Sequence, residues 1–217
     1  MKNSAGNKDQ CNNLQHDSLN RRRRGRSSYC MHDPKLVFSE LKLREGDYFL
    51  DMGCGLGDYT LHASKIVTDS GRVYALDISK TMIDLLVERI NSQGVKNVEA
   101  MVVDITDLLP IEDNCSDVCL IATVLHTIDL AKNGKTLFSE IHRVLKPAGR
   151  LSIINCKKED QPFGPPLHMR LSPKETEDSI KQHGFEKINL VDLGYNYMIT
   201  FKNKKKHKTP QPLTFRV

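Results

Sequence analysis

Residues 48–58 join an apolar strand to a helix through three glycines, and they read Tyr48-Phe49-Leu50-Asp51-Met52-Gly53-Cys54-Gly55-Leu56-Gly57-Asp58. Because glycine has no side chain, each glycine lets the backbone approach a ligand closely. The first turn of the helix that follows presents unpaired N–H groups to the same place. The segment therefore predicts a strand, a ligand-binding loop and a helix in direct succession.

The spacing of these glycines excludes two common nucleotide-binding motifs. The dinucleotide fingerprint Gly-x-Gly-x-x-Gly needs a further glycine at position 58 or 60, where the chain has Asp58 and Thr60. A phosphate-binding P-loop needs Gly-Lys-Ser/Thr, which does not follow here. An acid beside the glycines also repels a pyrophosphate, whereas it suits a ligand that carries an amino group. A tight turn without any ligand remains the alternative at this point.

Around this segment, short apolar runs alternate with longer helical patterns. Strands are expected at 48–52, 72–76, 98–103, 118–123 and 151–155, and helices at 59–67, 80–93 and 135–145. Asp33-Pro34 has the form of a helix cap followed by proline at the first helical position, and it predicts a leading helix that ends near residue 43. Such alternation is typical of a Rossmann-like α/β fold, a mostly parallel sheet with helices on both faces.

The pattern changes after residue 155. The segment 157–173 contains four prolines and one glycine, so it predicts an irregular loop. A helix is then expected at 174–183. Two further strands are expected at 188–191 and 195–201, with a hairpin-like turn at 192–194 between them.

The pattern Asp51-x-Gly53-x-Gly55-x-Gly57 resembles motif I of the class I S-adenosylmethionine-dependent methyltransferases. The helix and turn at 140–151 closely resemble those ahead of the fifth strand in that family. The resemblance covers roughly residues 33–201 and is closest to the type 11, or UbiE-like, group. It implies a seven-stranded sheet in which one antiparallel strand, 195–201, lies next to the fifth strand.

The resemblance also implies how the cofactor S-adenosylmethionine would be held. The glycine loop would contact its methionine part and ribose, Asp77 its ribose hydroxyls and Asp104 its adenine amino group. The implied cofactor residues are Asp51, Gly53, Cys54, Gly55, Gly57, Asp77, Ile78, Asp104, Ile105 and Thr123. A carboxylate can accept from both hydroxyls of a ribose, which is a reason for an acid at position 77. From the residues alone, a helix-start role for Asp77 and a turn role for Asp104 stay open.

The candidates for catalysis follow the fourth and fifth strands. Methyl transfer mainly requires an aligned acceptor and exclusion of water, and it needs a base only if the acceptor must lose a proton. His126 follows the fourth strand, and His168 and Arg170 lie in the 157–173 loop, which we expect to cover the acceptor. These three residues are predicted as catalytic. Structural roles stay open for each, including bonds from Arg170 to loop carbonyls. No metal site is predicted.

Charge and composition predict one domain with two basic ends. The chain has 217 residues and a net charge of +5, and residues 1–32 carry +5 and residues 202–217 carry +6, which leaves −6 between them. We expect a disordered arm at 1–32, the methyltransferase domain at 33–201 and a basic tail at 202–217. The six cysteines form no Cys-x-x-Cys pair, and no leader or membrane span is recognised. A cytoplasmic protein is therefore expected.

Two functions from different classes compete. The first is methyl transfer to a small-molecule acceptor. The second is a nucleic-acid-directed methyltransferase or binder, in which the arginines at 21–24 and the lysines at 204–206 contact phosphates. After the fourth strand the chain lacks both the Asn/Asp-Pro-Pro-Tyr/Phe stretch of enzymes that methylate base amines and the Pro-Cys nucleophile of cytosine methyltransferases. The sequence favours the small molecule and leaves the oligomeric state open.

Overall fold

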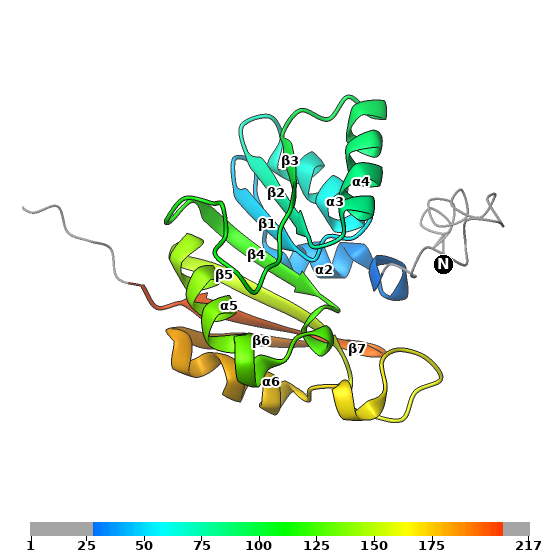
Figure 1. Ribbon diagram of the computed structural model, residues 1–217, viewed down its shortest axis with the longest axis vertical. Helices are drawn as coiled ribbons and strands as arrows, with labels where there is room; N and C mark the ends of the chain where they lie inside the picture. Colours follow the sequence, from blue (N-terminus) through cyan, green and yellow to red (C-terminus); the bar gives the residue numbers. More distant parts are fainter. Residues whose placement is uncertain (1–27, 206–217) are drawn as a thin grey trace, which may run out of the picture.

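The computed structural model describes residues 28–205, in which seven strands form one sheet (Figure 1). The order across the sheet is β3-β2-β1-β4-β5-β7-β6. The strands are β1 (Tyr48–Met52), β2 (Arg72–Asp77), β3 (Val98–Val102), β4 (Ser116–Ala122), β5 (Leu145–Cys156), β6 (Phe185–Leu193) and β7 (Asn196–Asn203). Strands β1 to β5 pair in parallel, and β7 is antiparallel to both β5 and β6. The predicted sheet, with one antiparallel strand beside the fifth, is confirmed.

Helices cover both faces of this sheet. On one face lie α2 (Pro34–Leu41), α3 (Asp58–Val67) and α4 (Lys80–Ser92), and on the other lie α5 (Leu130–Val144) and α6 (Pro173–Ile180) (Figure 1). Short 3-10 helices are η2 (Ser28–Met31), η3 (Leu125–Thr127), η4 (Leu167–Met169) and η5 (Lys181–His183). As predicted, Asp33 caps α2, since its side chain accepts from the Lys35 N–H at 2.9 Å. Among the described residues, no helix is long and apolar enough to cross a membrane.

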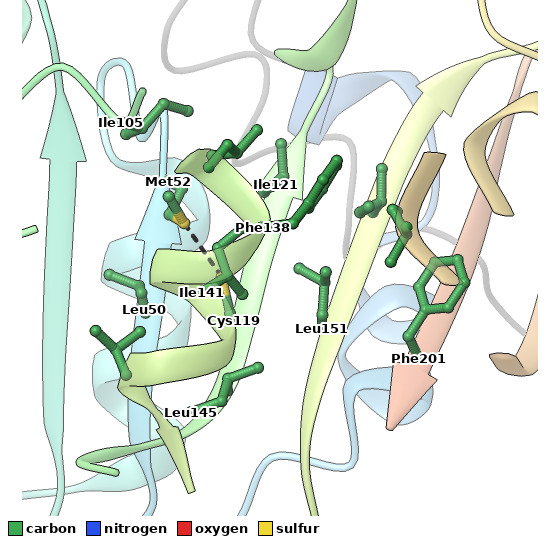
Figure 2. Close-up of a cluster of buried hydrophobic side chains, with 14 of the residues drawn as sticks. Leu50, Met52, Ile105, Cys119, Ile121, Phe138, Ile141, Leu145, Leu151 and Phe201 are labelled. Atoms are coloured by element: carbon green, nitrogen blue, oxygen red, sulfur yellow. Dashed lines mark hydrogen bonds between the residues drawn. The ribbon is translucent and has the colours of Figure 1, made fainter. Parts of the chain in front are cut away.

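The core lies in layers on both faces, because the central strands are apolar on both sides. In β4, Val118 and Leu120 pack with α2 and α3, whereas Cys119 and Ile121 pack with α5. Figure 2 shows the second of these layers, with Phe138 of α5 against the sheet. Continuous apolar strands covered on both faces are typical of parallel sheets. The carboxyl ends of the strands are thus the part of the sheet that remains available for a site.

Helix α5 and strand β5 both begin earlier than the sequence predicted, each for a local reason. Helix α5 begins at Leu130 rather than at 135, because the Asp129 side chain accepts from the N–H groups of Ala131 and Lys132 at 3.1 and 3.2 Å. Strand β5 begins directly after α5, since Leu145 already pairs with β4. The turn expected within 140–151, ahead of the fifth strand, is instead an irregularity within this strand, where Ala148 has φ of 62°.

The predicted domain boundaries at 32 and 202 also need correction, because residues 28–32 and 202–205 belong to the fold. Ahead of α2, the Tyr29 hydroxyl bonds His62 Nδ1 at 2.7 Å. At the other end, Lys205 Nζ donates to the carbonyls of His142 and Arg143, which end α5, at 3.2 and 2.9 Å. These are contacts between distant segments, which a local pattern does not reveal. The rest of the predicted arm and tail, 1–27 and 206–217, lies outside the described residues.

The stability of the fold is expected to depend on the protonation of His32. Its Nε2 pairs with the Tyr59 hydroxyl, and burial lowers the pKa of the ring from 6.5 to about 4, although Asp33 opposes part of the shift. In the unfolded chain His32 becomes protonated near pH 6.5, whereas in the folded chain it stays neutral down to about pH 4. The free energy of unfolding therefore keeps its full value above pH 6.5 and falls as the pH drops toward 4. In His32→Gln, the unfolding free energy should therefore vary less over this window, by up to about 1.4 kcal/mol per pH unit.

Chemical denaturation of both proteins between pH 4 and 7 measures this difference. The other histidines are unchanged in the variant, so they contribute equally to both curves. Identical pH dependence of the two unfolding free energies would contradict the prediction.

Candidate active site

The loop between β1 and α3 requires glycine at three positions, for two different reasons. Gly53, Gly55 and Gly57 have φ of 77°, 53° and 76°, a left-handed conformation that side chains disfavour. A Cβ on Gly53 would collide with Val124, and one on Gly57 would collide with Leu86. A Cβ on Gly55 would meet no atom within 4 Å. Packing therefore requires Gly53 and Gly57, whereas Gly55 borders open space.

Asp77, at the end of β2, is held by the loop on one side and by the start of α4 on the other. Its Oδ2 accepts from the Gly55 N–H at 2.9 Å, and its Oδ1 accepts from the Ser79 N–H at 2.8 Å. Ser79 is itself the cap of α4. Each carboxylate oxygen has a second lone pair, so these bonds leave Asp77 able to accept from a ligand.

A cavity of about 380 Å³ opens at the carboxyl ends of the central strands, and we name it the first cavity. It is lined by the predicted cofactor residues Gly53, Asp77, Ile78, Asp104, Ile105 and Thr123, together with Val103, Thr106, Val124, Thr127, Ile128, Asp129 and Asn133. The residues from strands β1 to β4 converge here because parallel strands end at the same edge of the sheet.

Ile78 and Asp104 make part of this cavity suitable for a flat polar ring. Ile78 is apolar and yet 68% exposed, and it borders the cavity. Asp104 Oδ1 accepts from the N–H and the hydroxyl of Thr106 at 2.9 and 2.7 Å, so the turn role left open by the sequence is present too. An apolar surface beside a carboxylate can stack a ring and accept hydrogen bonds from its edge.

Asp51 lies beneath the glycine loop and does not line the first cavity. It is fully buried and accepts a hydrogen bond from the Thr60 hydroxyl at 2.6 Å. Burial raises the pKa of Asp51 from 3.8 to about 7, with the Thr60 bond opposing the shift. The carboxyl is thus only partly ionised at neutral pH, and its described contacts hold the loop in place.

Cys54 and Gly57, both predicted to contact the cofactor, pack the loop against α4. The Cys54 side chain is buried in an apolar cluster that includes Leu61 and Leu86. Gly57 faces the same Leu86 side chain, and it begins α3 as the cap residue. Arg89 of α4 adds a bridge to Asp58 at 3.0 Å. The sequence pattern identified the loop but did not distinguish its inner side from its ligand side.

A second cavity, of about 430 Å³, adjoins the first at Thr123, which lines both. Its other lining residues are Ser28, Met31, His126, Cys156, Phe163, Gly164 and Pro165. Four segments that are far apart in the sequence meet here: η2, η3, the end of β5 and the 157–172 loop. The predicted cover over the acceptor thus supplies one wall of a real cavity.

His126 is the ionisable group best placed in the second cavity. It lies in η3, at the carboxyl end of β4, where the sequence predicted it. Burial lowers the pKa of the imidazole below 6.5. The ring is therefore neutral at physiological pH and can accept a proton.

Thr123 has an unusual backbone conformation at the junction of the two cavities. Its φ is 55°, which is rare for a β-branched residue. The Thr123 N–H donates to the Ile154 carbonyl at 2.7 Å, and its hydroxyl donates to the Ala122 carbonyl at 2.8 Å. Such conformations persist where the surroundings enforce them, and they cluster at functional sites. The turn at Thr123 directs the chain from β4 into η3 and so positions His126.

Arg170, predicted as catalytic, makes structural contacts within the loop. Its side chain is buried, with 6% exposed, and it lines neither of the two cavities. The guanidinium donates, at 2.7 to 3.3 Å, to the backbone carbonyls of Lys157, Glu159, Phe163 and Pro165. These bonds fix the loop, so Arg170 is a positioning residue. This is the alternative that the sequence had left open.

His168, also predicted as catalytic, lies away from both cavities. It lies in η4, where its side chain is exposed, and it lines neither cavity. The loop crosses the expected edge of the sheet, but η4 turns this residue toward solvent. Of the three predicted catalytic residues, His126 is the one that borders a large cavity.

Sequence reasoning missed Ser28, Met31 and Cys156 in the second cavity. Ser28 and Met31 fell in the segment assigned to the disordered arm, and Cys156 follows the predicted end of the fifth strand. One signal was present: Tyr29-Cys30-Met31 is an apolar and aromatic run directly ahead of the helix start at Asp33. Such a run favours packing over disorder.

The fold and the site together define a class of protein. A three-glycine loop after β1, acids after β2 and β3, and an antiparallel β7 beside β5 are the arrangement of a class I S-adenosylmethionine-dependent methyltransferase. The chain belongs to the methyltransferase domain family, whose sequence profile matches residues 43–209.

Individual relatives agree with this assignment. A SAM-dependent methyltransferase from Aquifex aeolicus is 30% identical, with a TM-score of 0.76 over 84% of this chain and 96% of that one. The demethylmenaquinone methyltransferase of Lactobacillus johnsonii is 32% identical over 129 residues, which are 59% of this chain and 52% of the relative. The chain thus spans about half the length of the curated relatives it matches. Geranyl diphosphate C-methyltransferase from Streptomyces coelicolor A3(2), 18% identical with a TM-score of 0.63 over 78% of each chain, shares the fold.

Proposed function

We propose that this chain transfers a methyl group from S-adenosylmethionine to a small-molecule acceptor. The observation that carries the proposal is the meeting of two cavities at Thr123, one bordered by Asp77 and Asp104 and the other by neutral His126. A donor and an acceptor on the two sides of one strand end would be aligned for direct transfer, which is the main requirement of this reaction. The named acceptors of two relatives, demethylmenaquinone and geranyl diphosphate, are small molecules, which supports the same class here.

The residues of the first cavity fit S-adenosylmethionine. Asp77 retains lone pairs for ribose hydroxyls, and Ile78 offers an exposed apolar surface to a ring. Gly55 is not among the lining residues, but it bonds to Asp77 and leaves open the space that a Cβ would fill. The bound cofactor supplies a methyl group on a positively charged sulfur. Asp77, Asp104 and Asp129 border this cavity, and their negative charge favours a cationic ligand.

In the second cavity, His126 is the base for an acceptor that must lose a proton. Its neutral imidazole accepts that proton. The turn at Thr123 positions η3, and with it His126, next to the first cavity. Ser28, Met31 and the loop at 163–165 limit the access of water to the same space. Exclusion of water strengthens the electrostatic interactions at the reacting atoms.

The nucleic-acid alternative has less support. It rests on the basic ends of the chain, and Lys205 already donates to carbonyls at the end of α5, which is a structural role. The arginines at 21–24 lie outside the described residues. A cytoplasmic location stays a prediction from the sequence.

Cofactor binding tests the proposed function directly. Asp77→Ala should bind S-adenosylhomocysteine at least tenfold more weakly in calorimetry, since the lost charge-assisted hydrogen bonds contribute about 1.5 to 3 kcal/mol. Asp84→Ala, which removes an exposed acid of α4 that pairs with Lys80, is the matched control and should bind normally. Unchanged affinity in Asp77→Ala, or no binding by the unmodified chain, would remove the cofactor from the first cavity.

A further inference from the structure

The second cavity has an uncharged lining among the described residues. Met31, Phe163, Gly164 and Pro165 contribute apolar surface, and Ser28 and Thr123 contribute hydroxyl groups. The two remaining lining groups ionise, but burial keeps each in its neutral form: it raises the pKa of the Cys156 thiol and lowers that of His126. The cavity therefore offers a ligand shape, apolar contact and a few hydrogen bonds, without a formal charge.

Three cations of the 157–172 loop are engaged by other partners. Arg170 donates four of its five N–H groups to loop carbonyls. Lys157 pairs with Asp192 at 2.8 Å, and Lys158 pairs with Glu175 at 2.5 Å. An anionic ligand in this cavity would thus have to compete with these partners for a cation, and an unpaired buried charge is strongly disfavoured.

The N-terminal wall of the cavity is built by specific contacts. Ser28 and Met31 of η2 form this wall, and the segment is fixed through the Tyr29 bond to His62 and the His32 bond to Tyr59. The Tyr29 and Tyr59 rings also meet edge to face, with 5.1 Å between centroids. The wall opposite the loop is therefore a defined surface that can select a ligand by shape.

The mouth of the cavity continues this apolar character. Phe163 of the loop contacts Tyr195 of the β6–β7 turn, with 4.6 Å between ring centroids. Both rings are partly exposed, at 38% and 48%, as are Leu167 and Met169 of η4, at 51% and 37%. Exposed apolar side chains gathered beside a pocket are typical of a ligand-binding rim.

We propose that the second cavity selects an uncharged, largely apolar acceptor, with η2 and the 157–172 loop as its two walls. This inference rests on the proposed function, in which this cavity holds the methyl acceptor. It adds the chemical class of that acceptor, and it assigns a specificity role to Met31 and Phe163.

The test compares two ligands that share one ring system and differ in charge. The full chain is first titrated with S-adenosylhomocysteine by calorimetry, and the complex is then titrated with 2-naphthol or 2-naphthyl phosphate by naphthalene fluorescence. The chain has no tryptophan, which keeps the protein background low. We expect 2-naphthol to bind at least tenfold more tightly than the phosphate.

Charge-introducing variants then locate the binding. Met31→Lys should weaken 2-naphthol and strengthen the phosphate, each about tenfold, with S-adenosylhomocysteine affinity unchanged. Leu36→Lys, an apolar-to-lysine change on exposed α2, is the matched control and should alter neither ligand. If Met31→Lys folds poorly, Phe163→Lys on the opposite wall should change the affinities for the two ligands in the same directions.

The outcomes separate the two proposals. If S-adenosylhomocysteine binds but 2-naphthol does not, or if the phosphate binds as tightly as the naphthol, the inferred acceptor class is overturned and the proposed function stands. Naphthol binding that neither lysine variant changes would also overturn it, because the ligand would then lie elsewhere. Failure of S-adenosylhomocysteine to bind would instead refute the proposed function.

Discussion

His126→Gln is expected to lower kcat for methyl transfer by about a hundredfold or more while leaving the affinity for S-adenosylhomocysteine within about twofold. Glutamine keeps a similar size and can still form hydrogen bonds, but it cannot take up the proton of the acceptor. His126 borders the second cavity and lines no part of the first, so the lesion should be confined to the acceptor side. Steady-state rates with a methyl acceptor that ionises, together with calorimetry, measure the two quantities.

The pH profile gives this prediction its second readout. Burial lowers the pKa of His126 below 6.5, so kcat/KM should fall on the acidic side with a midpoint below pH 6.5, as the ring becomes protonated. The acidic limb should be absent from His126→Gln. His183→Gln is the control, since burial lowers the pKa of this histidine too, and it packs on Phe138 instead of lining either cavity. A wild-type rate and profile in His126→Gln would exclude a base at this position.

Gly55→Val is expected to weaken S-adenosylhomocysteine binding by about a hundredfold or more. The side chain would enter open space next to Asp77, whose carboxylate accepts from the Gly55 N–H, and this is the space that we assign to the cofactor. The substitution should also destabilise the fold by about 1 to 3 kcal/mol, because valine is strained at φ of 53°.

A matched control separates these two effects. Gly94 has φ of 64°, and a Cβ there would likewise meet nothing within 4 Å, but it follows the end of α4, whereas Asp77 precedes the start of that helix. Gly94→Val should therefore lose similar stability in thermal unfolding and keep full cofactor affinity. Equal cofactor affinities in the two variants would place the ligand away from Gly55.

The cofactor side of the site was largely predictable because each of its parts is local. A strand, a turn and the start of a helix occupy adjacent residues, so the strand order implied by the resemblance brings Gly53, Asp77 and Asp104 to one edge of the sheet. The structure places these three residues together because parallel strands end at the same edge of the sheet. The same reasoning could not assign sides within the loop, since whether Cys54 faces a ligand or α4 depends on packing against Leu86.

By itself, the sequence determined the seven-stranded sheet, the glycine loop and the acids that follow β2 and β3, because strand and helix periodicity and glycine spacing are properties of neighbouring residues. Only the tertiary structure decided the acceptor side. Met31, His126 and Phe163 share one cavity although long stretches of chain separate them, and the Arg170 side chain donates to loop carbonyls. The physical reason is that side-chain packing and hydrogen-bond partners between distant segments are set by the folded backbone, and they leave no periodic trace in the sequence.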